Sequence, residues 1–230
     1  MEECTVKHRK LLPLAALAMG LACLLGRRVL YATSVDSTGL LKSGTPLEWG
    51  TYLLSALALT LWIVSSRREE GKILPDSVTV LGQIIGAVGI GWTALRYPGE
   101  MPGLVGNLWK ILGIVSAVCL IWWSVCTFRG KSPQFPVQLA PCLFWLTHMV
   151  DNYRNWSGAP QLQSYLFALL GTMAMTLFTY CLSAEAVGME KPRRKKFAAL
   201  AAGYFCTAAA MPGKNQFLYL LCALWALFSL

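Results

Sequence analysis

The sequence is poor in charged residues, and this scarcity excludes most soluble classes of protein. Only 13% of its 230 residues are Asp, Glu, Lys or Arg, whereas 56% are apolar. A soluble domain usually carries about 25% charged residues. The apolar residues stand in long blocks instead of an alternating pattern, and the mean hydropathy is +0.52. A soluble enzyme, a disordered chain and a nucleic-acid-binding domain are therefore excluded, and an all-α membrane protein is favoured.

The residue sets that most catalytic and metal sites require are also missing. The three aspartates are spread over the chain, so they do not form the paired acidic motifs with which membrane transferases hold Mg²⁺. Two histidines cannot supply a zinc site, and the eight cysteines contain no Cys-x-x-Cys pair. A P-loop, a Rossmann fingerprint and a Gly-x-Ser-x-Gly elbow are absent. We therefore expect no cofactor and no metal.

The apolar blocks predict the transmembrane helices. A helix that spans a bilayer needs about 20 mostly apolar residues. Eight such blocks lie near residues 11–31, 46–66, 75–96, 103–127, 134–153, 161–186, 196–211 and 213–230. The seventh block is short and rich in Ala, so we expect it to be buried among the other helices. The sequence thus predicts an all-α polytopic membrane protein, with about eight transmembrane helices in a single domain over 1–230.

The distribution of basic residues predicts the orientation in the membrane. The predicted loops alternate between two sides. One side carries seven of the 20 Lys and Arg residues, which are Arg27, Arg28, Lys42, Arg96, Lys110, Arg154 and Lys214, and the other side carries thirteen. The more basic side of a membrane protein is usually cytoplasmic. We therefore predict a multi-pass protein of the cell membrane with both termini in the cytoplasm.

Short motifs suggest that the chain consists of two related halves, 1–130 and 131–230. The tetrapeptide SGTP at 43–46 recurs as SGAP at 157–160, and MPG at 101–103 recurs at 211–213. In both halves each motif opens a helix that runs in the same direction. Parallel repeats of this kind occur in several transporter folds. The alternative is coincidence, because turns reuse Gly and Pro.

Two further patterns predict local packing and charge. Gly82, Gly86, Gly89 and Gly91 form a stripe of small residues on the third predicted helix. Close helix packing explains such a stripe better than a ligand does. The basic run at 191–196 precedes the seventh helix. It either enforces the orientation or binds anionic lipid headgroups.

Four polar residues within the predicted spans are the candidate substrate-binding residues. They are Glu48, Lys110, His148 and Asp151, each in the outer third of its helix. A charged group inside a bilayer costs several kcal/mol, so such residues are often functional. His148 and Asp151 are three residues apart, so they share a helix face and can hydrogen-bond. We expect all four to line one outward-facing cavity between the second, fourth and fifth helices. In the alternative interpretation they only mark the wet membrane interface.

Three hypotheses for the function remain open. The first is a small membrane transporter or permease for a polar solute, coupled to protons through His148. The second is a scaffold without catalysis that binds another membrane protein. The third is an intramembrane enzyme in which His148 and Asp151 act on a lipid-linked substrate. The transporter is favoured because loops are short and polar groups within the spans are few. Membrane lipids are the expected partners in each case, and nucleic acid is excluded.

Overall fold

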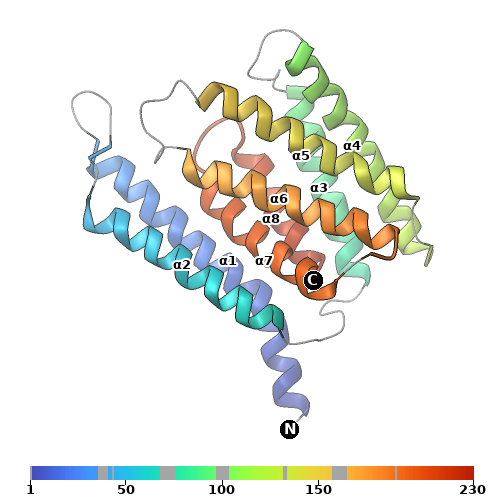
Figure 1. Cartoon of the computed structure of the whole chain (residues 1–230), viewed down its shortest axis with the longest axis horizontal. Helices are drawn as coiled ribbons and strands as arrows, with labels where there is room; N and C mark the ends of the chain where they lie inside the picture. The colour runs from blue at the N-terminus through green and yellow to red at the C-terminus, as the bar shows by residue number, and fades with distance from the viewer. Residues whose placement is uncertain are drawn as a thin grey trace.

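The computed structural model is a bundle of helices (Figure 1). It describes residues 2–35, 41–42, 44–67, 76–96, 104–131, 134–156, 165–189 and 191–230. Within these ranges the helices are α1 (Glu2–Thr33), α2 (Pro46–Arg67), α3 (Asp76–Arg96), α4 (Leu104–Phe128), α5 (Phe135–Trp156), α6 (Leu166–Ala186), α7 (Pro192–Ala209) and α8 (Gln216–Phe228). An isolated β-bridge joins Val35 and Leu41. The all-helical prediction is confirmed, and the helix positions agree with the apolar blocks except that α1 begins at Glu2.

Five of the described helices are long and apolar enough to cross a membrane. They are Leu11–Thr33, Pro46–Arg67, Asp76–Arg96, Gly106–Phe128 and Leu166–Glu185. The other three helices differ from them in composition or length. α5 contains His148, Asp151 and Arg154, α7 begins with four basic residues after its first proline, and α8 has only 13 residues. The structure thus supports a membrane-embedded helical protein with several spans.

The centre of the bundle is the pair α7 and α8. α7 packs against α1, α2, α6 and α8, and α8 packs mainly against α3 and α7. Figure 1 shows α1 and α2 together on one side of the α7–α8 pair, with α3, α4 and α5 on the other side. Every residue from Ala198 to Ala210 is buried. The prediction that the seventh helix is buried among the others is confirmed, because its small side chains allow neighbouring helices to approach from several directions.

The glycine stripe of α3 is the contact surface for α8. A Cβ atom at Gly82 would lie 2.7 Å from Phe228, one at Gly86 would lie 2.8 Å from the Trp225 ring, and one at Gly89 would lie 2.9 Å from Leu221. These distances are shorter than normal carbon contacts, so only glycine fits. The packing role predicted for this stripe is confirmed.

Serine hydroxyls from two neighbouring helices support α5 around its internal proline. Pro141 has no N–H group to donate to the preceding turn. Ser183 of α6 donates a hydrogen bond to the carbonyl of Gln138 at 2.8 Å, and Ser116 of α4 donates to the carbonyl of Ala140 at 2.9 Å. A proline within an apolar environment is tolerated when neighbouring helices satisfy nearby backbone groups in this way.

The two predicted halves pack differently in the bundle. The repeat would make α3 the counterpart of α7, yet α3 packs against α4 and α8, whereas α7 packs against four helices. Of the motifs that suggested the repeat, residues 43, 101–103 and 157–160 lie outside the described residues. The helix packing therefore adds no support for two equivalent halves.

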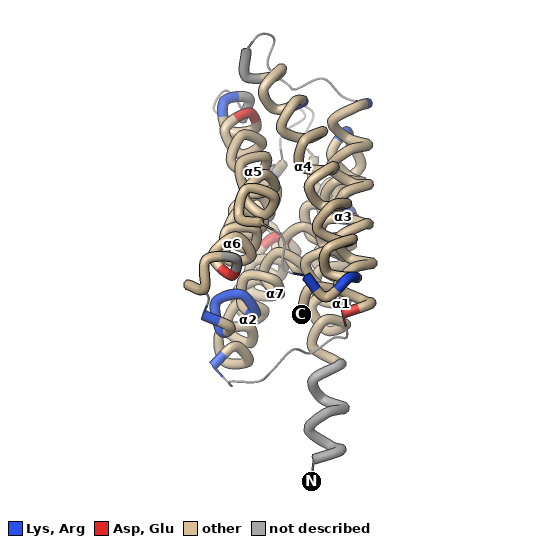
Figure 2. Tube along the Cα trace, turned by 90° about the vertical axis from the view of Figure 1, so that its right-hand side faces the viewer, with Lys and Arg blue, Asp and Glu red and all other residues tan. Residues whose placement is uncertain are grey.

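Both ends of the chain lie at the same end of the bundle, which we call the terminal end (Figures 1 and 2). The α4–α5 and α6–α7 connections also lie there, and the α7–α8 connection lies at the opposite, distal end. Figure 2 shows most charged residues toward the two ends of the bundle. This distribution is typical of a helical protein whose middle is surrounded by lipid.

The contact between α3 and α8 predicts the effect of one added methyl group. Gly86→Ala should lower the free energy of unfolding by about 1–3 kcal/mol, because the Trp225 ring must shift to accept the Cβ atom. Gly50→Ala is the matched control, since nothing lies within 4 Å of its Cβ position. Thermal unfolding of the purified variants in one detergent measures the difference. Equal melting temperatures for both variants would contradict the packing argument.

Candidate functional site

A buried polar cluster is centred on His148 in α5. The His148 side chain is 1% exposed. Its Nδ1 atom accepts a hydrogen bond of 2.9 Å from the indole N–H of Trp109 in α4. Its Nε2 atom lies 3.0 Å from the side-chain amide of Asn152, one helical turn further along α5. Both ring nitrogens of His148 therefore have partners.

Aromatic rings enclose the His148 imidazole on several sides. Phe144 stacks parallel to it at a centroid distance of 5.9 Å, and Trp145 meets it edge-on at 5.5 Å. Trp109 and Tyr219 lie at centroid distances of 5.8 Å and 6.2 Å. These rings come from α4, α5 and α8, so the cluster joins three helices. Its low polarity disfavours a charged imidazolium.

The hydrogen bonds around His148 indicate a neutral ring with its proton on Nε2. An indole N–H can only donate, so Nδ1 must carry the lone pair. A neutral imidazole has one donor and one acceptor, so Nε2–H donates to the Asn152 amide when that amide presents its oxygen. Protonation of Nδ1 would place two N–H groups against each other. His148 is therefore poorly suited to take up a second proton, on Nδ1, and so to act as a proton carrier.

The predicted pairing of His148 with Asp151 is replaced by the contact with Asn152. Asp151 is 2% exposed and Asn152 is 3% exposed. Positions three and four residues away share the same helix face, so the spacing alone did not distinguish the two side chains. The pattern located the correct face of α5 but named the wrong hydrogen-bond partner.

The structure does not bring the four predicted substrate-binding residues together. Glu48 is buried at the start of α2, where its carboxylate accepts hydrogen bonds from the Gly44 N–H at 2.8 Å and the Tyr52 hydroxyl at 3.0 Å. α2 packs against α1 and α7, whereas α4 and α5 pack against each other elsewhere in the bundle. Lys110 is exposed on α4, next to the buried Trp109. In the described residues, Glu48 is thus held on a different helix pair from Lys110, His148 and Asp151, and a substrate-binding role for these four residues stays a prediction.

Sequence reasoning missed Arg27 as a buried residue. Arg27 in α1 is 4% exposed, and its guanidinium donates a hydrogen bond of 2.7 Å to the carbonyl of Ala208. Ala208 belongs to the last turn of α7, where carbonyls lack helical partners and the helix dipole is negative. The guanidinium also lies 4.5 Å from the centre of the Phe167 ring in α6. Arg27 thus caps α7 and joins three helices, whereas the sequence indicated only that it is one of the basic residues of one membrane side.

A pocket opens at the distal end of the bundle, around the connection between α7 and α8. Its volume is about 210 Å³. The residues that line it are Ala209, Met211, Gly213, Lys214, Asn215, Gln216 and Tyr219. The Tyr219 ring also contacts Trp145 and His148, at centroid distances of 6.4 Å and 6.2 Å. Tyr219 therefore connects this pocket, called the distal pocket, to the His148 cluster.

Two buried hydrogen-bond donors beside the distal pocket lack acceptors. Among the described residues, neither the Tyr219 hydroxyl nor the Trp145 indole N–H has a hydrogen-bond partner. Tyr219 is 3% exposed and Trp145 is fully buried. Each unpaired buried donor costs about 1–3 kcal/mol. A buried donor without an acceptor needs an explanation, because most buried polar groups in proteins are hydrogen-bonded. In the sequence, a lone tyrosine in an apolar block gave no sign that its hydroxyl would lack an acceptor.

The hydrogen bond from Trp109 to His148 predicts a specific loss of stability. Trp109→Phe should lower the free energy of unfolding by about 1–3 kcal/mol, because it leaves the buried Nδ1 acceptor without a donor. Trp122→Phe is the control, since Trp122 lies on the same helix and is 58% exposed. Thermal unfolding in detergent compares the two variants. An equal effect of both substitutions would show that the hydrogen bond contributes nothing.

The chain matches no protein-family model, no curated protein and no solved structure. Its function is therefore inferred from its own residues. The candidate functional site is the distal pocket, with Tyr219 in its lining and Trp145 and His148 in contact with Tyr219.

Proposed function

We propose that this protein is a small multi-pass membrane transporter for a polar solute, which enters through the distal pocket. The observation that supports this proposal most directly is Tyr219. It lines the pocket, and its buried hydroxyl lacks a partner among the described residues. The neighbouring Trp145 offers a second donor without an acceptor. A solute with oxygen acceptors would satisfy both groups, and the pocket volume suits a molecule of a few heavy atoms.

The lengths of the helices support a pocket that lies below the membrane surface. α8 has 13 residues and α4 has 25, so they rise about 20 Å and about 37 Å. The hydrocarbon core of a bilayer is about 30 Å thick. If α8 ends near the terminal surface, its first residues lie about 10 Å short of the opposite surface. The longer helices around it then form the walls of an entrance. Short or interrupted helices often line the substrate sites of transporters.

We further propose that all eight helices cross the membrane and that the terminal end faces the cytoplasm. α5, α7 and α8 are less apolar or shorter than the other helices, but much of their surface is covered by protein. Polar residues are tolerated in a membrane helix that faces the interior of a bundle. The count of basic residues supports the cytoplasmic assignment of the terminal end. Two parallel halves stay a further prediction within this scheme.

The scaffold hypothesis remains the second candidate, because many apolar side chains in the middle of the bundle are fully buried. Leu200, Cys206 and Cys222 are fully buried between α7 and its neighbours. A resting transporter in a closed state and a scaffold would both have such a core. The enzyme hypothesis is less well supported, since His148 bonds to Trp109 and Asn152 and not to Asp151.

Removal of one oxygen atom tests the proposed transport function. Tyr219→Phe should lower solute uptake about two- to tenfold, the effect of losing one hydrogen bond. It should not lower stability, because it removes a buried group without a partner. Tyr180→Phe is the control, since Tyr180 is 59% exposed on α6. Uptake of labelled alanine, lactate and glucose into proteoliposomes provides the measurement.

The outcomes of this experiment separate transporter from scaffold. Uptake of one probe that Tyr219→Phe reduces and Tyr180→Phe leaves unchanged would support transport through the distal pocket. Uptake that is equal in both variants would contradict the role of Tyr219. If no probe enters proteoliposomes and Tyr219→Phe only raises the melting temperature, the scaffold is favoured.

The proposed orientation predicts which residues a membrane-impermeant thiol reagent reaches in intact cells. Lys42 and Arg194 are both exposed, at opposite ends of the bundle. Lys42→Cys should be modified from outside, and Arg194→Cys should be modified only after the membrane is made permeable. Labelling of the protein without either substitution is subtracted, because it measures the reaction of the native cysteines. The opposite pattern would overturn the assignment of the terminal end to the cytoplasm.

A further inference from the structure

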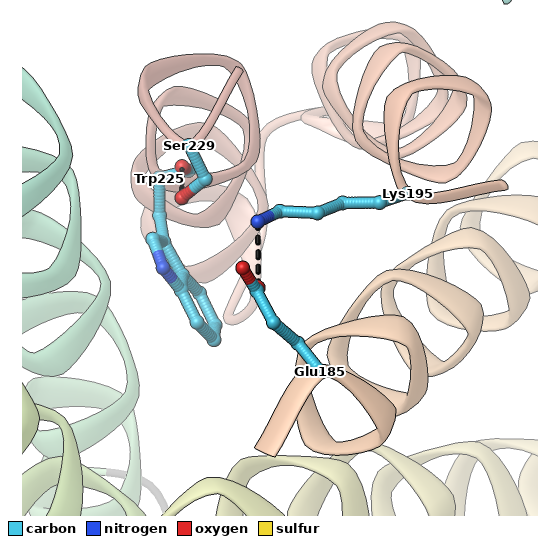
Figure 3. Close-up of polar contacts among 4 residues, drawn as sticks. All are labelled: Glu185, Lys195, Trp225 and Ser229. Carbon is cyan, nitrogen blue, oxygen red and sulfur yellow. Dashed lines mark hydrogen bonds and ion pairs between the residues drawn. The ribbon is translucent and has the colours of Figure 1, made fainter. Parts of the chain in front are cut away.

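An ion pair joins α6 to α7 at the terminal end of the bundle. The ammonium of Lys195 lies 2.6 Å from a carboxylate oxygen of Glu185, and Figure 3 shows the two side chains extended toward each other. Glu185 stands near the end of α6 and Lys195 in the first turn of α7. A carboxylate near the N-terminus of α7 is also favoured by the helix dipole. The pair therefore holds the ends of these two helices together.

Some basic residues of the run at 191–196 make contacts between helices, and others are exposed at the surface. Lys196, the neighbour of Lys195, is 8% exposed and donates a hydrogen bond of 3.1 Å to the carbonyl of Ser65, in the last turn of α2. Lys191 and Arg194 are exposed at the surface. Two lysines of the run thus connect α7 to α6 and α2, in addition to any effect of the run on orientation.

Near this end of the bundle, α8 carries another buried donor without a partner among the described residues. Trp225 in α8 is fully buried, and its indole N–H has no hydrogen-bond partner among the described residues. Its ring packs against Phe178 of α6 at a centroid distance of 5.4 Å. Phe178 and Glu185 are seven residues apart, so they lie on the same face of α6, about 10 Å apart along the axis. Figure 3 shows Trp225 and Ser229 beside the ion pair.

We propose that the Glu185–Lys195 pair is the gate of the solute path at the terminal end, and that Trp225 lines the path behind it. This inference rests on the proposed transport function, because it assigns the exit of the same path. The distal end has an open pocket, whereas at the terminal end the ion pair and the Lys196 hydrogen bond join α7 to α6 and α2. Transporters alternate between states that open to one side at a time. The structure corresponds to a state that is closed at the terminal end.

The exposure of the ion pair suits a gate that must open. The Lys195 and Glu185 side chains are 22% and 44% exposed. A partly exposed ion pair contributes little net stability, since water replaces the partner when the pair separates. A fully buried pair would leave two uncompensated charges on opening, at a much larger cost. Loss of the Glu185–Lys195 contact should therefore shift the population of open molecules without unfolding the protein.

Thiol accessibility behind the gate tests this proposal. Ser229 is 6% exposed, and its hydroxyl donates to the carbonyl of Trp225, so Ser229→Cys is a small change beside Trp225. The purified protein in lipid nanodiscs is treated with a water-soluble maleimide. Adding Glu185→Gln should raise the labelling rate of Cys at 229 about two- to fivefold, the range expected for a partly exposed ion pair. The chain without Ser229→Cys corrects for native cysteines.

Matched variants separate the gate from a general effect of charge. Arg194→Gln removes a neighbouring exposed charge and should leave the labelling rate unchanged. The exchange of both charges, Glu185→Lys with Lys195→Glu, should restore slow labelling. Equal rates in all variants, or fast labelling in the charge-exchanged protein, would overturn the gate. The measurement needs no solute, so its failure is distinguishable from failure of the uptake experiment with Tyr219→Phe.

Discussion

The close approach of α3 to α8 is the contact on which the rest of the bundle depends. Gly82, Gly86 and Gly89 leave room for the backbone and the large side chains of α8. Because α8 has only 13 residues, it cannot be embedded in lipid alone over the full thickness of a bilayer. Tight packing against α3 on one side and the small residues of α7 on the other gives α8 a protein environment. Small residues serve this purpose in membranes because lipid and apolar side chains are equally apolar, so packing decides association.

The position of α8 in turn determines where polar groups are found. Tyr219 near its start lines the distal pocket, and Trp225 near its end lies toward the terminal end, where Figure 3 shows it beside the Glu185–Lys195 pair. Both side chains carry donors that lack partners among the described residues. The region between them contains apolar side chains such as Cys222 and Ala223, which are buried. One short helix thus carries unsatisfied polar groups near both ends and an apolar segment between them. In the proposed transporter, these two groups lie near opposite ends of the solute path.

Three other buried polar residues are hydrogen-bonded and hold helices in place. His148 links α4 to α5 through Trp109, Arg27 caps the last turn of α7, and Glu48 binds the backbone N–H of Gly44. Burying a polar group costs free energy unless the group is hydrogen-bonded. The hydrogen bonds of these residues therefore indicate a structural role. Tyr219 and Trp225 differ from these three residues, because their donors lack partners among the described residues.

The sequence by itself determined the class, the helix positions and the packing role of the glycine stripe. Apolar length and composition set those features, because the thickness of the bilayer and the size of glycine act on each segment separately. The sequence also identified His148 as a residue of interest, since a polar side chain in an apolar block is visible without a structure.

Only the tertiary structure decided which polar residues contact one another. Glu48 lies far along the chain from Lys110 and His148, and their separation depends on α2 packing against α1 and α7. Tyr219 and Trp225 resemble ordinary core aromatics in the sequence, and only the tertiary structure shows that their donors lack acceptors. Hydrogen-bond partners are decided by the orientation of whole helices, and helix periodicity does not encode that orientation.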